Sequence, residues 1–308
     1  MNNVICIVGP TASGKTGLSI ELAKRINGEI ISADSMQIYK NLNIGTAKVT
    51  LQEMQGINHH MIDIISPDQD FSVADFKKIC YEKIEDIIKR GKIPVIVGGT
   101  GLYVSSVILD MNFEEQIIDE EYRSMLYKLS ADFSNKYVHD MLVKVDEQSA
   151  NEIHPNNLKR VIRALEMYKL NKTKSEHIED EKERINSKQT KYNFKLFCLK
   201  LDKEILHERI NIRVDQMMDD GLEDEAKIVY DLPKCTAKQA VGYKEFFEYF
   251  EEKTDLNKVI EDIKLKTRQY AKRQMTWFKK MPNIIYLDAT NTKDKNIEEI
   301  MVNLYEKH

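Results

Sequence analysis

The chain has 308 residues, of which 42% are hydrophobic and 31% are charged, and its formal net charge is −4. At roughly 150 residues per domain, this length favours two domains or one large domain with an insertion. The composition is typical of a soluble globular protein with a buried core. The negative net charge argues against a protein coated in basic residues, although a local basic stripe on an acidic body can still bind nucleic acid.

The sequence argues against a membrane protein and against a protein with a cysteine-bound metal cluster. The longest apolar runs, such as Ile93–Gly99, are far too short to span a bilayer. The N-terminus has no basic stretch and begins at once with a strand-like segment, so we expect no signal peptide. Cys6, Cys80, Cys198 and Cys235 are isolated and lack metal-ligand spacing. We therefore expect a cytoplasmic protein with four reduced, mostly buried thiols and no membrane partner.

Strands and helices alternate in the first third of the chain. The expected elements are a strand over Val4–Val8, a helix over Gly17–Ile26, a strand over Glu29–Ala33, a helix over Ala74–Lys89 and a strand over Ile93–Val97. Buried apolar runs that alternate with helical periodicity indicate a parallel α/β sheet. Ligand sites of such a sheet lie at the carboxyl ends of its strands.

The pattern changes after about Asn112. Helical periodicity dominates from Asp119 to about Glu183, and no segment there resembles a strand. Strand character returns at Phe194–Leu201, and long helices follow over Lys203–Met218, from near Glu223, and over Lys258–Lys280. We predict a P-loop parallel sheet with flanking helices, formed by residues 1–112 and 193–308, and an all-helical insertion domain at residues 113–192.

The first strand runs into a phosphate-binding motif. Its residues are Gly9, Pro10, Thr11, Ala12, Ser13, Gly14, Lys15 and Thr16, which fit G-x-x-x-x-G-K-[ST] in full. The glycines let the backbone curl so that its N–H groups face anionic oxygens. Lys15 adds a positive charge, and the Thr16 hydroxyl can hold a phosphate oxygen or Mg²⁺. Because the motif follows a strand and opens a helix, we predict a diphosphate or triphosphate site.

A P-loop usually belongs to a nucleotide hydrolase or kinase, which needs a second acid at the end of a neighbouring strand to hold Mg²⁺. Here the third strand ends in Val97-Gly98-Gly99-Thr100, without an acid, and the second ends at Asp34. Asp34 could hold Mg²⁺ through water, bind a ribose or act as a base, and the residues alone leave these roles open. The missing acid weakens the kinase interpretation.

Longer blocks of sequence resemble the bacterial tRNA dimethylallyltransferases, the tRNA isopentenyltransferase family. These blocks occur in the family's order and span nearly the whole chain: Gly9–Thr16, Ile31–Tyr39, Asn43–Lys48, His59–Asp63, Val97–Tyr103, Ile153–Asn157, Lys159–Glu166, Gln239–Tyr243 and Thr267–Trp277. The resemblance implies transfer of a dimethylallyl group from its diphosphate to N6 of adenosine 37 in tRNA, with Mg²⁺ as cofactor and Thr16 as the expected metal ligand.

The resemblance also assigns roles to residues. It implies that the P-loop holds the diphosphate, that Asp34 is the general base, and that Arg213 clamps the diphosphate beside Lys15 and Thr16. The residues that match tRNA contacts of the family are Asp34, Ser35, Met36, Gln37, Thr100, Arg123, Lys159, Arg160, Val161, Ile162, Arg163, Lys238, Gly242, Tyr243 and Lys244. A base in the anticodon stem-loop must leave its stack to reach such a pocket.

A basic stripe occupies the last long helix. Lys264–Lys280 contains no acid, and its basic residues recur at helical spacing. We expect Lys266, Arg268, Lys272 and Arg273 to contact the tRNA backbone. The alternative is a solvated helix face with Trp277 packed against the core.

Two other functions compete with prenyl transfer. The first is a P-loop small-molecule kinase, which consumes ATP and needs no RNA. The second is an RNA-binding protein whose nucleotide site has no catalytic role. Monomer is the expected oligomeric state.

Overall fold

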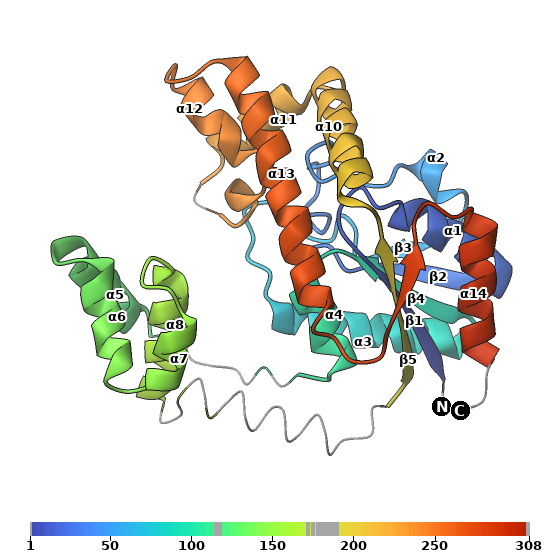
Figure 1. Cartoon of the computed structure of the whole chain (residues 1–308), viewed down its shortest axis with the longest axis horizontal. Coiled ribbons are helices and arrows are strands. Elements are labelled where there is room, and N and C mark those ends of the chain that lie inside the picture. The colour runs from blue at the N-terminus through green and yellow to red at the C-terminus, as the bar shows by residue number, and fades with distance from the viewer. Residues whose placement is uncertain are drawn as a thin grey trace. The chain divides into compact units, whose positions relative to one another are not determined.

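The computed structural model describes residues 2–111, 113, 119–170, 173, 176, 191–233 and 235–305. The chain forms two compact units (Figure 1). Met1–Ile108 and Thr190–His308 make the first, and Leu109–Gln189 makes the second. In the described part of the chain, no helix is long and apolar enough to cross a bilayer.

A six-stranded parallel sheet forms the centre of the first unit, with strand order β3-β2-β4-β1-β5-β6. The strands are β1 Asn3–Val8, β2 Gly28–Ser32, β3 His59–His60, β4 Ile93–Gly98, β5 Asn193–Lys200 and β6 Ile284–Asp288. β5 pairs directly with β1, so the chain returns to the same sheet after the second unit. The predicted parallel α/β sheet is confirmed; β3 and β6 are additions to it.

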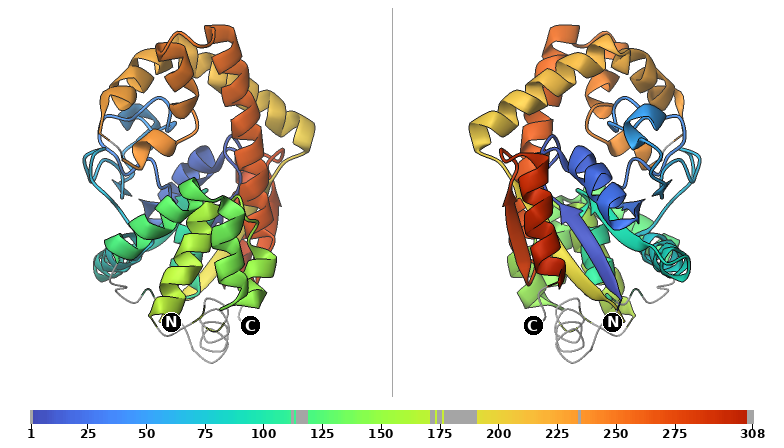
Figure 2. Two further views of the ribbon diagram at one scale, coloured as in Figure 1. Left: turned by 90° about the vertical axis from the view of Figure 1, so that its left-hand side faces the viewer. Right: turned by 90° about the vertical axis from the view of Figure 1, so that its right-hand side faces the viewer.

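Helices cover both faces of this sheet. The helices of the first unit are α1 Lys15–Ile26, α2 Leu51–Met54, α3 Val73–Lys89, α4 Gly101–Ile108, α10 Lys203–Asp219, α11 Leu222–Asp231, α12 Phe247–Phe250, α13 Leu256–Phe278 and α14 Lys293–Tyr305, with short 3₁₀ turns η1 Ala237–Gln239 and η2 Lys244–Phe246. α1 and α14 pack on one face, and α3 and α4 pack on the other. Figures 1 and 2 show α10–α13 gathered beyond the carboxyl ends of the strands.

The strand sequences follow from this two-sided cover. Val4–Val8 is apolar throughout and fully buried, because alternate side chains of β1 enter the two different cores. Cys6, Cys80 and Cys198 are buried free thiols and Cys235 is a half-buried one. The cysteines are therefore mostly buried, as expected, and their reduced state stays a prediction.

Every regular element that the structure describes in the second unit is a helix. Its helices are α5 Glu120–Asp132, α6 Asn135–Val143, α7 Glu147–Glu152 and α8 Leu158–Lys169. Asp119, Ser134 and Asp146 cap the first three by accepting a backbone hydrogen bond. Apolar side chains at helical spacing build a core of their own, which includes Leu126 and Leu165.

Candidate active site

Three neighbouring strands place their carboxyl ends at one point of the sheet. β4 lies between β1 and β2, so the P-loop, the segment after β4 and Asp34 after β2 come together. A Cβ atom on Gly98 would lie 2.1 Å from the Ala33 carbonyl oxygen, so only glycine permits this approach. Thr100 joins the two strand ends, since its N–H donates to Ala33 O at 3.2 Å and its Oγ1 accepts from Ser35 N–H at 3.0 Å.

The P-loop has the curled backbone that the motif predicts. Gly9 and Gly14 have φ angles of 144° and 90°, a region that favours glycine. The first hydrogen bond of α1 runs from Leu18 N–H to Gly14 O, at 3.2 Å. The backbone N–H groups that precede this hydrogen bond have no partner within the helix. They form the positive end of α1, where anions bind. Ser13 Oγ is buried without a hydrogen-bond partner in the described structure, and a ligand oxygen would satisfy it.

Two cations lie at this loop. Lys15 Nζ donates to Pro10 O at 2.6 Å. Arg213 from α10 contacts Thr11 Oγ1 at 3.4 Å. Burial and then the Arg213 charge lower the pKa of Lys15 to about 8, although Asp34 partly opposes this shift. Burial also lowers the pKa of Arg213. Both shifts indicate positive charges that lack sufficient counter-charge, as expected where a multivalent anion binds.

Asp34 is the carboxylate of this site. Its Oδ1 accepts the Met36 N–H at 2.9 Å, which fixes the side chain. Burial raises the pKa of Asp34, while that hydrogen bond and the Lys15 charge act in the opposite direction. A carboxylate with a raised pKa is a stronger base than a free aspartate, so the site can accept a proton beside a bound anion.

The residues also fit a Mg²⁺ ion that is held mainly by phosphate and water. Among the described residues, no group of three His, Cys, Asp or Glu side chains could hold a metal. Mg²⁺ bound with phosphates keeps several waters and uses one or two protein ligands. The hydroxyl of the exposed Thr16, at the start of α1, can supply one protein ligand. The buried Ser13 Oγ has no hydrogen-bond partner in the described structure and can bond to an oxygen of the phosphate that accompanies the ion.

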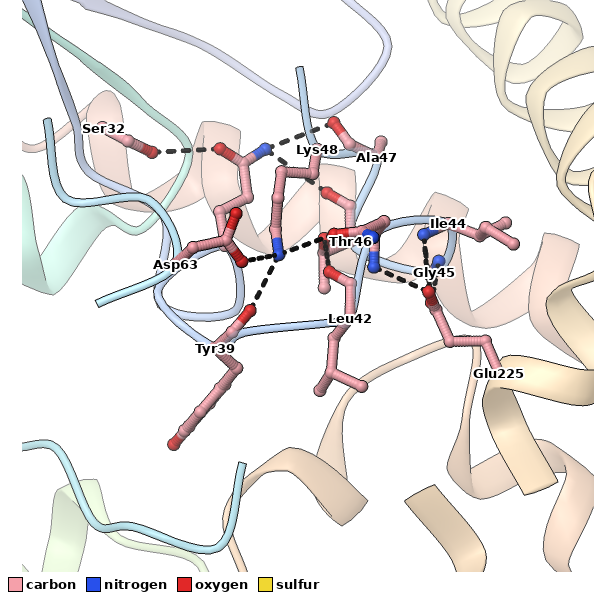
Figure 3. Close-up of polar contacts among 12 residues, drawn as sticks. Ser32, Tyr39, Leu42, Ile44, Gly45, Thr46, Ala47, Lys48, Asp63 and Glu225 are labelled. Carbon is pink, nitrogen blue, oxygen red and sulfur yellow. Dashed lines mark hydrogen bonds and ion pairs between the residues drawn. The ribbon is translucent and has the colours of Figure 1, made fainter. Parts of the chain in front are cut away.

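The side chains of Gln37 and Lys48 hold the loop that continues from Asp34 (Figure 3). Gln37 accepts from Ser32 Oγ at 3.0 Å, and its amide nitrogen donates to two backbone carbonyls. Lys48 Nζ bonds to Tyr39 O at 2.8 Å and to Asp63 Oδ1 at 2.6 Å. The loop following Asp34 is therefore preorganised.

Glu225 of α11 anchors the next part of this loop. Its buried carboxylate accepts the successive backbone N–H groups of Asn43, Ile44 and Gly45, at 2.6–3.0 Å (Figure 3). It also accepts from Tyr243 Oη at 2.7 Å. No local sequence pattern marks Glu225, because the three backbone groups that it binds lie about 180 positions earlier in the chain.

Comparison with known proteins identifies the family of the chain. The sequence model of the IPP transferase family matches residues 37–281. The chain belongs to the IPP transferase family. The family match begins just after Asp34 and covers the loop that Glu225 anchors, α10 and α13.

Relatives of this IPP transferase match over nearly its whole length. A tRNA dimethylallyltransferase of Bacillus licheniformis is 48% identical over 290 residues, which are 93% of this chain and 91% of the relative. A tRNA dimethylallyltransferase of Bacillus anthracis is 47% identical, covering 94% and 91%. The solved full-length tRNA isopentenylpyrophosphate transferase of Bacillus halodurans has a TM-score of 0.74 at 43% identity, covering 99% and 96%. A eukaryotic dimethylallyltransferase acting on tRNA has a TM-score of 0.76 at 34% identity, covering 98% and 78%.

The side chains of three expected tRNA contacts in this IPP transferase do not reach the surface. Val161 and Ile162 lie in the core of the second unit, and Tyr243 is fully buried with its hydroxyl on Glu225. Val161 and Ile162 are buried because their apolar side chains pack with other apolar side chains of the second unit. Tyr243 is buried because its ring packs in a core of the first unit and its hydroxyl bonds to Glu225. Lys159, Arg160 and Lys244, from the same two segments, are exposed. In these two segments, only such exposed neighbours and backbone atoms remain as predicted tRNA contacts.

Other basic residues expected to contact tRNA have protein partners. Arg123 pairs with the buried Glu166 through Nε and Nη2, at 2.7 and 3.1 Å, and Arg163 approaches the same carboxylate at 3.4 Å. Lys238 Nζ donates to Tyr230 O at 2.7 Å. The Glu166 carboxylate offsets part of the charge of the two arginines, whereas the carbonyl only holds Lys238 in place. Binding of tRNA by these residues stays a prediction.

The basic stripe of α13 divides between two sides. Lys264 pairs with Asp215 at 2.8 Å and Arg268 donates to Asn211 at 2.6 Å, so both hold α13 against α10. In contrast, Lys266, Lys272 and Arg273 are exposed. Trp277 donates to Ser105 Oγ at 2.9 Å, and its ring packs over Gly101. Trp277 thus contacts α4 but stays 39% exposed, and it lies on the same helix as an exposed basic face.

Proposed function

We propose that this chain transfers a dimethylallyl group from dimethylallyl diphosphate to N6 of adenosine 37 in tRNA, giving N6-isopentenyladenosine. The observation that carries the proposal is the pairing of a cationic P-loop with one basic carboxylate, Asp34, at the neighbouring strand end. The named relatives, tRNA dimethylallyltransferases and tRNA isopentenylpyrophosphate transferases, support the same reaction.

The P-loop suits the leaving group of this reaction. As the allylic C–O bond breaks, negative charge accumulates on the departing diphosphate. Backbone N–H groups at the start of α1, the Lys15 ammonium and the Arg213 guanidinium are already placed to stabilise that charge. Mg²⁺, when bound with the diphosphate at Thr16, would neutralise further charge there.

Asp34 suits the nucleophile. Adenine N6 is a weak nucleophile because its lone pair is delocalised into the ring. It becomes reactive when a proton leaves as the C–N bond forms, and Asp34 can accept that proton. The Met36 N–H and the bridge from Thr100 to Ser35 hold the carboxylate and its loop in place. The reaction also requires the base to leave the anticodon stack.

A small-molecule kinase is less well supported. Kinases and nucleotide hydrolases with a P-loop hold Mg²⁺ with a further acid on a neighbouring strand. The end of β4, which lies beside β1, carries Gly98, Gly99 and Thr100 in that position. In the proposed prenyl transfer, a Mg²⁺ ion held mainly by the diphosphate, water and Thr16 would not need that acid.

The proposal is tested by incubating the protein with unmodified tRNA and labelled dimethylallyl diphosphate, with ATP and small acceptors in parallel. We expect label only in tRNA. Asp34→Ala and Asp34→Asn should each lower turnover by about 10²–10⁴-fold, with tRNA affinity nearly unchanged because the loop hydrogen bonds of Gln37 and Glu225 remain. Phosphate transfer from ATP to a small acceptor would establish the kinase instead. Binding of tRNA without turnover would establish an RNA-binding protein.

The monomeric state and cytoplasmic location of this protein are parts of the same proposal. Light scattering of the purified chain tests the first, and fractionation of cells that express it tests the second.

A further inference from the structure

Gln274 of α13 joins the P-loop to the segment that follows β4. The residue is 5% exposed. Its amide oxygen accepts the Thr11 N–H at 2.9 Å, and its amide nitrogen donates to Gly99 O at 2.9 Å. Both ends of the amide therefore have backbone partners, one on each side of the site.

This amide bridges the two segments where the ladder between β1 and β4 stops. Val8 and Gly98 are the last paired residues of these strands. Beyond them, one segment enters the P-loop and the other leads into α4. The Gln274 side chain thus continues the connection between the two segments after the sheet itself has ended.

The surroundings hold Gln274 in one place. Ala271, in the preceding turn of α13, shares a small apolar cluster with Ala12 of the P-loop, and Phe278, in the following turn, is fully buried in a larger core. A Cβ atom on Gly99 would lie 2.1 Å from the Gln274 amide nitrogen. The glycine thus leaves the space that the glutamine occupies.

A second side chain of α13 extends this bridge toward Asp34. Tyr270 lies one turn before Gln274, and its hydroxyl hydrogen-bonds with the side chains of Thr100 and Gln274. Thr100 Oγ1 in turn accepts the N–H of Ser35, the residue after Asp34. Burial and then the Asp34 charge raise the pKa of Tyr270 to about 12, so its hydroxyl keeps its proton at neutral pH. Polar contacts therefore run without a break from the P-loop to the segment that carries the carboxylate.

We propose that Gln274 is a positioning residue for the transfer step, because it fixes the P-loop against the end of β4 and so sets the distance between the leaving group and the nucleophile. The inference rests on the proposed function, in which the diphosphate lies in the P-loop and the adenine lies beside Asp34. Reacting atoms must lie about 3–3.5 Å apart and in line, and a displacement of about 1 Å can cost ~10²-fold in rate. Since protein groups bond both ends of its amide, Gln274 acts through the segments that it holds. Its loss should therefore lower the rate of transfer and leave substrate affinity intact.

The test compares the wild-type protein with Gln274→Met, which has a side chain of similar length but lacks both hydrogen-bonding groups. The rate is measured in a single turnover of unmodified tRNA, with enzyme and dimethylallyl diphosphate at saturating concentration. Titration calorimetry gives the affinity for inorganic pyrophosphate with Mg²⁺, and fluorescence anisotropy gives the affinity for tRNA. We expect the single-turnover rate to fall about 10- to 100-fold, while both affinities remain those of the wild type.

Two further variants accompany this comparison. Gln216→Met is the matched control, because it makes the same substitution at an exposed position of α10, where the glutamine bonds to Asp220 one turn away. Its rate should equal that of the wild type. Tyr270→Phe removes one hydroxyl and leaves both backbone bonds of Gln274 in place, so its rate should fall less, about 2- to 10-fold, the range of one neutral hydrogen bond.

An unchanged rate in Gln274→Met, with a melting temperature near that of the wild type, overturns the proposal. A loss of pyrophosphate affinity as large as the loss of rate also overturns it, because Gln274 would then shape only the phosphate site. If Gln274→Met does not fold, Tyr270→Phe decides, and an unchanged rate there is the contrary result. Without prenyl transfer by the wild-type protein, the proposed function fails and this inference fails with it. Wild-type transfer with an unchanged variant rate defeats this inference alone.

Discussion

Lys15 and Asp34 have shifted pKa values that reflect one cause. Each is charged and largely withdrawn from water, so burial disfavours its charged form. The pKa of Lys15 falls to about 8 and the pKa of Asp34 rises. Each charge partly stabilises the other, but the nearby Arg213 adds a second positive charge at the loop. In the proposed reaction a diphosphate would supply the missing negative charge, and Asp34 would be left free to take a proton.

These shifts predict a bell-shaped dependence of kcat/KM for dimethylallyl diphosphate on pH. The alkaline limb should lie near pH 8, because Lys15 in the free enzyme loses its proton there. The acid limb should lie above about pH 3.9, the ordinary aspartate value, because Asp34 must be ionised and its pKa is raised. Steady-state rates across this pH range measure both limbs.

Lys15→Arg separates the two groups. Arginine stays protonated throughout this range, so the alkaline limb should disappear while the acid limb remains. The height of the profile is expected to fall, since a guanidinium does not reproduce the contact of a lysine, and only the shape is diagnostic. An alkaline limb near pH 8 that persists in Lys15→Arg would assign it to another group.

At the scale of elements, Glu225 couples α11 to the loop that follows Asp34. Its carboxylate accepts three successive N–H groups and the Tyr243 hydroxyl. Glu225→Gln would turn an amide donor toward groups that are themselves donors. We expect the free energy of unfolding to fall by about 2–3 kcal/mol and the KM for tRNA to rise, with affinity for pyrophosphate unchanged.

Chemical denaturation and steady-state kinetics check this prediction. Asp224→Asn is its control, since Asp224 is an exposed acid on the same helix and neutralises the same charge. Equal effects of Glu225→Gln and Asp224→Asn would show that the charge of α11, and not the anchored loop, matters.

The elements that sequence predicted best are those whose pattern is local. The buried run of β1, the periodicity of α3 and the P-loop between β1 and α1 each lie within a short window, so their existence follows from composition and spacing. β3 contains only His59 and His60, and its pairing with β2 is decided by tertiary contacts. β6 is a short edge strand that depends on β5 for its place.

The same distinction applies to the site. Asp34 could be singled out because it ends a predicted strand beside the P-loop. Glu225 and Gln274 could not, because no local pattern marks either residue. The backbone partners of Glu225 lie at least 180 positions away, and Gln274 bonds to Thr11 N–H and Gly99 O, 263 and 175 positions away. The available sequence signal for Gln274 was that it lies in Thr267–Trp277, a block that resembles the tRNA isopentenyltransferase family. Lys264 and Arg268 share a basic stripe with Lys272, yet they face α10, and only packing reveals that.

For the whole molecule, net charge and local charge have opposite signs. The chain carries −4 overall, so at long range it does not attract a polyanion. Binding of tRNA must therefore depend on short-range contacts from exposed basic residues. On α13 these include Lys266, Lys272 and Arg273, whereas Lys264 and Arg268 are held by α10.

The double variant Lys266→Ala with Lys272→Ala is expected to weaken tRNA binding and to flatten its salt dependence. If each lysine neutralises one phosphate, the slope of log K against log salt concentration should fall by about 1.4–1.8 in magnitude. Filter binding or fluorescence anisotropy at several salt concentrations measures the slope.

Removing two lysines also changes the net charge from −4 to −6, since −4 − 2 = −6. Lys78→Ala with Lys89→Ala makes the same change on α3, where both side chains are exposed. This control therefore carries the long-range effect of charge without the contacts of α13. A larger loss of slope in the Lys266 and Lys272 variant than in the control would place α13 against the RNA backbone. Equal slopes in the two variants would mean that repulsion by the acidic body accounts for the change and that this face of α13 does not meet tRNA.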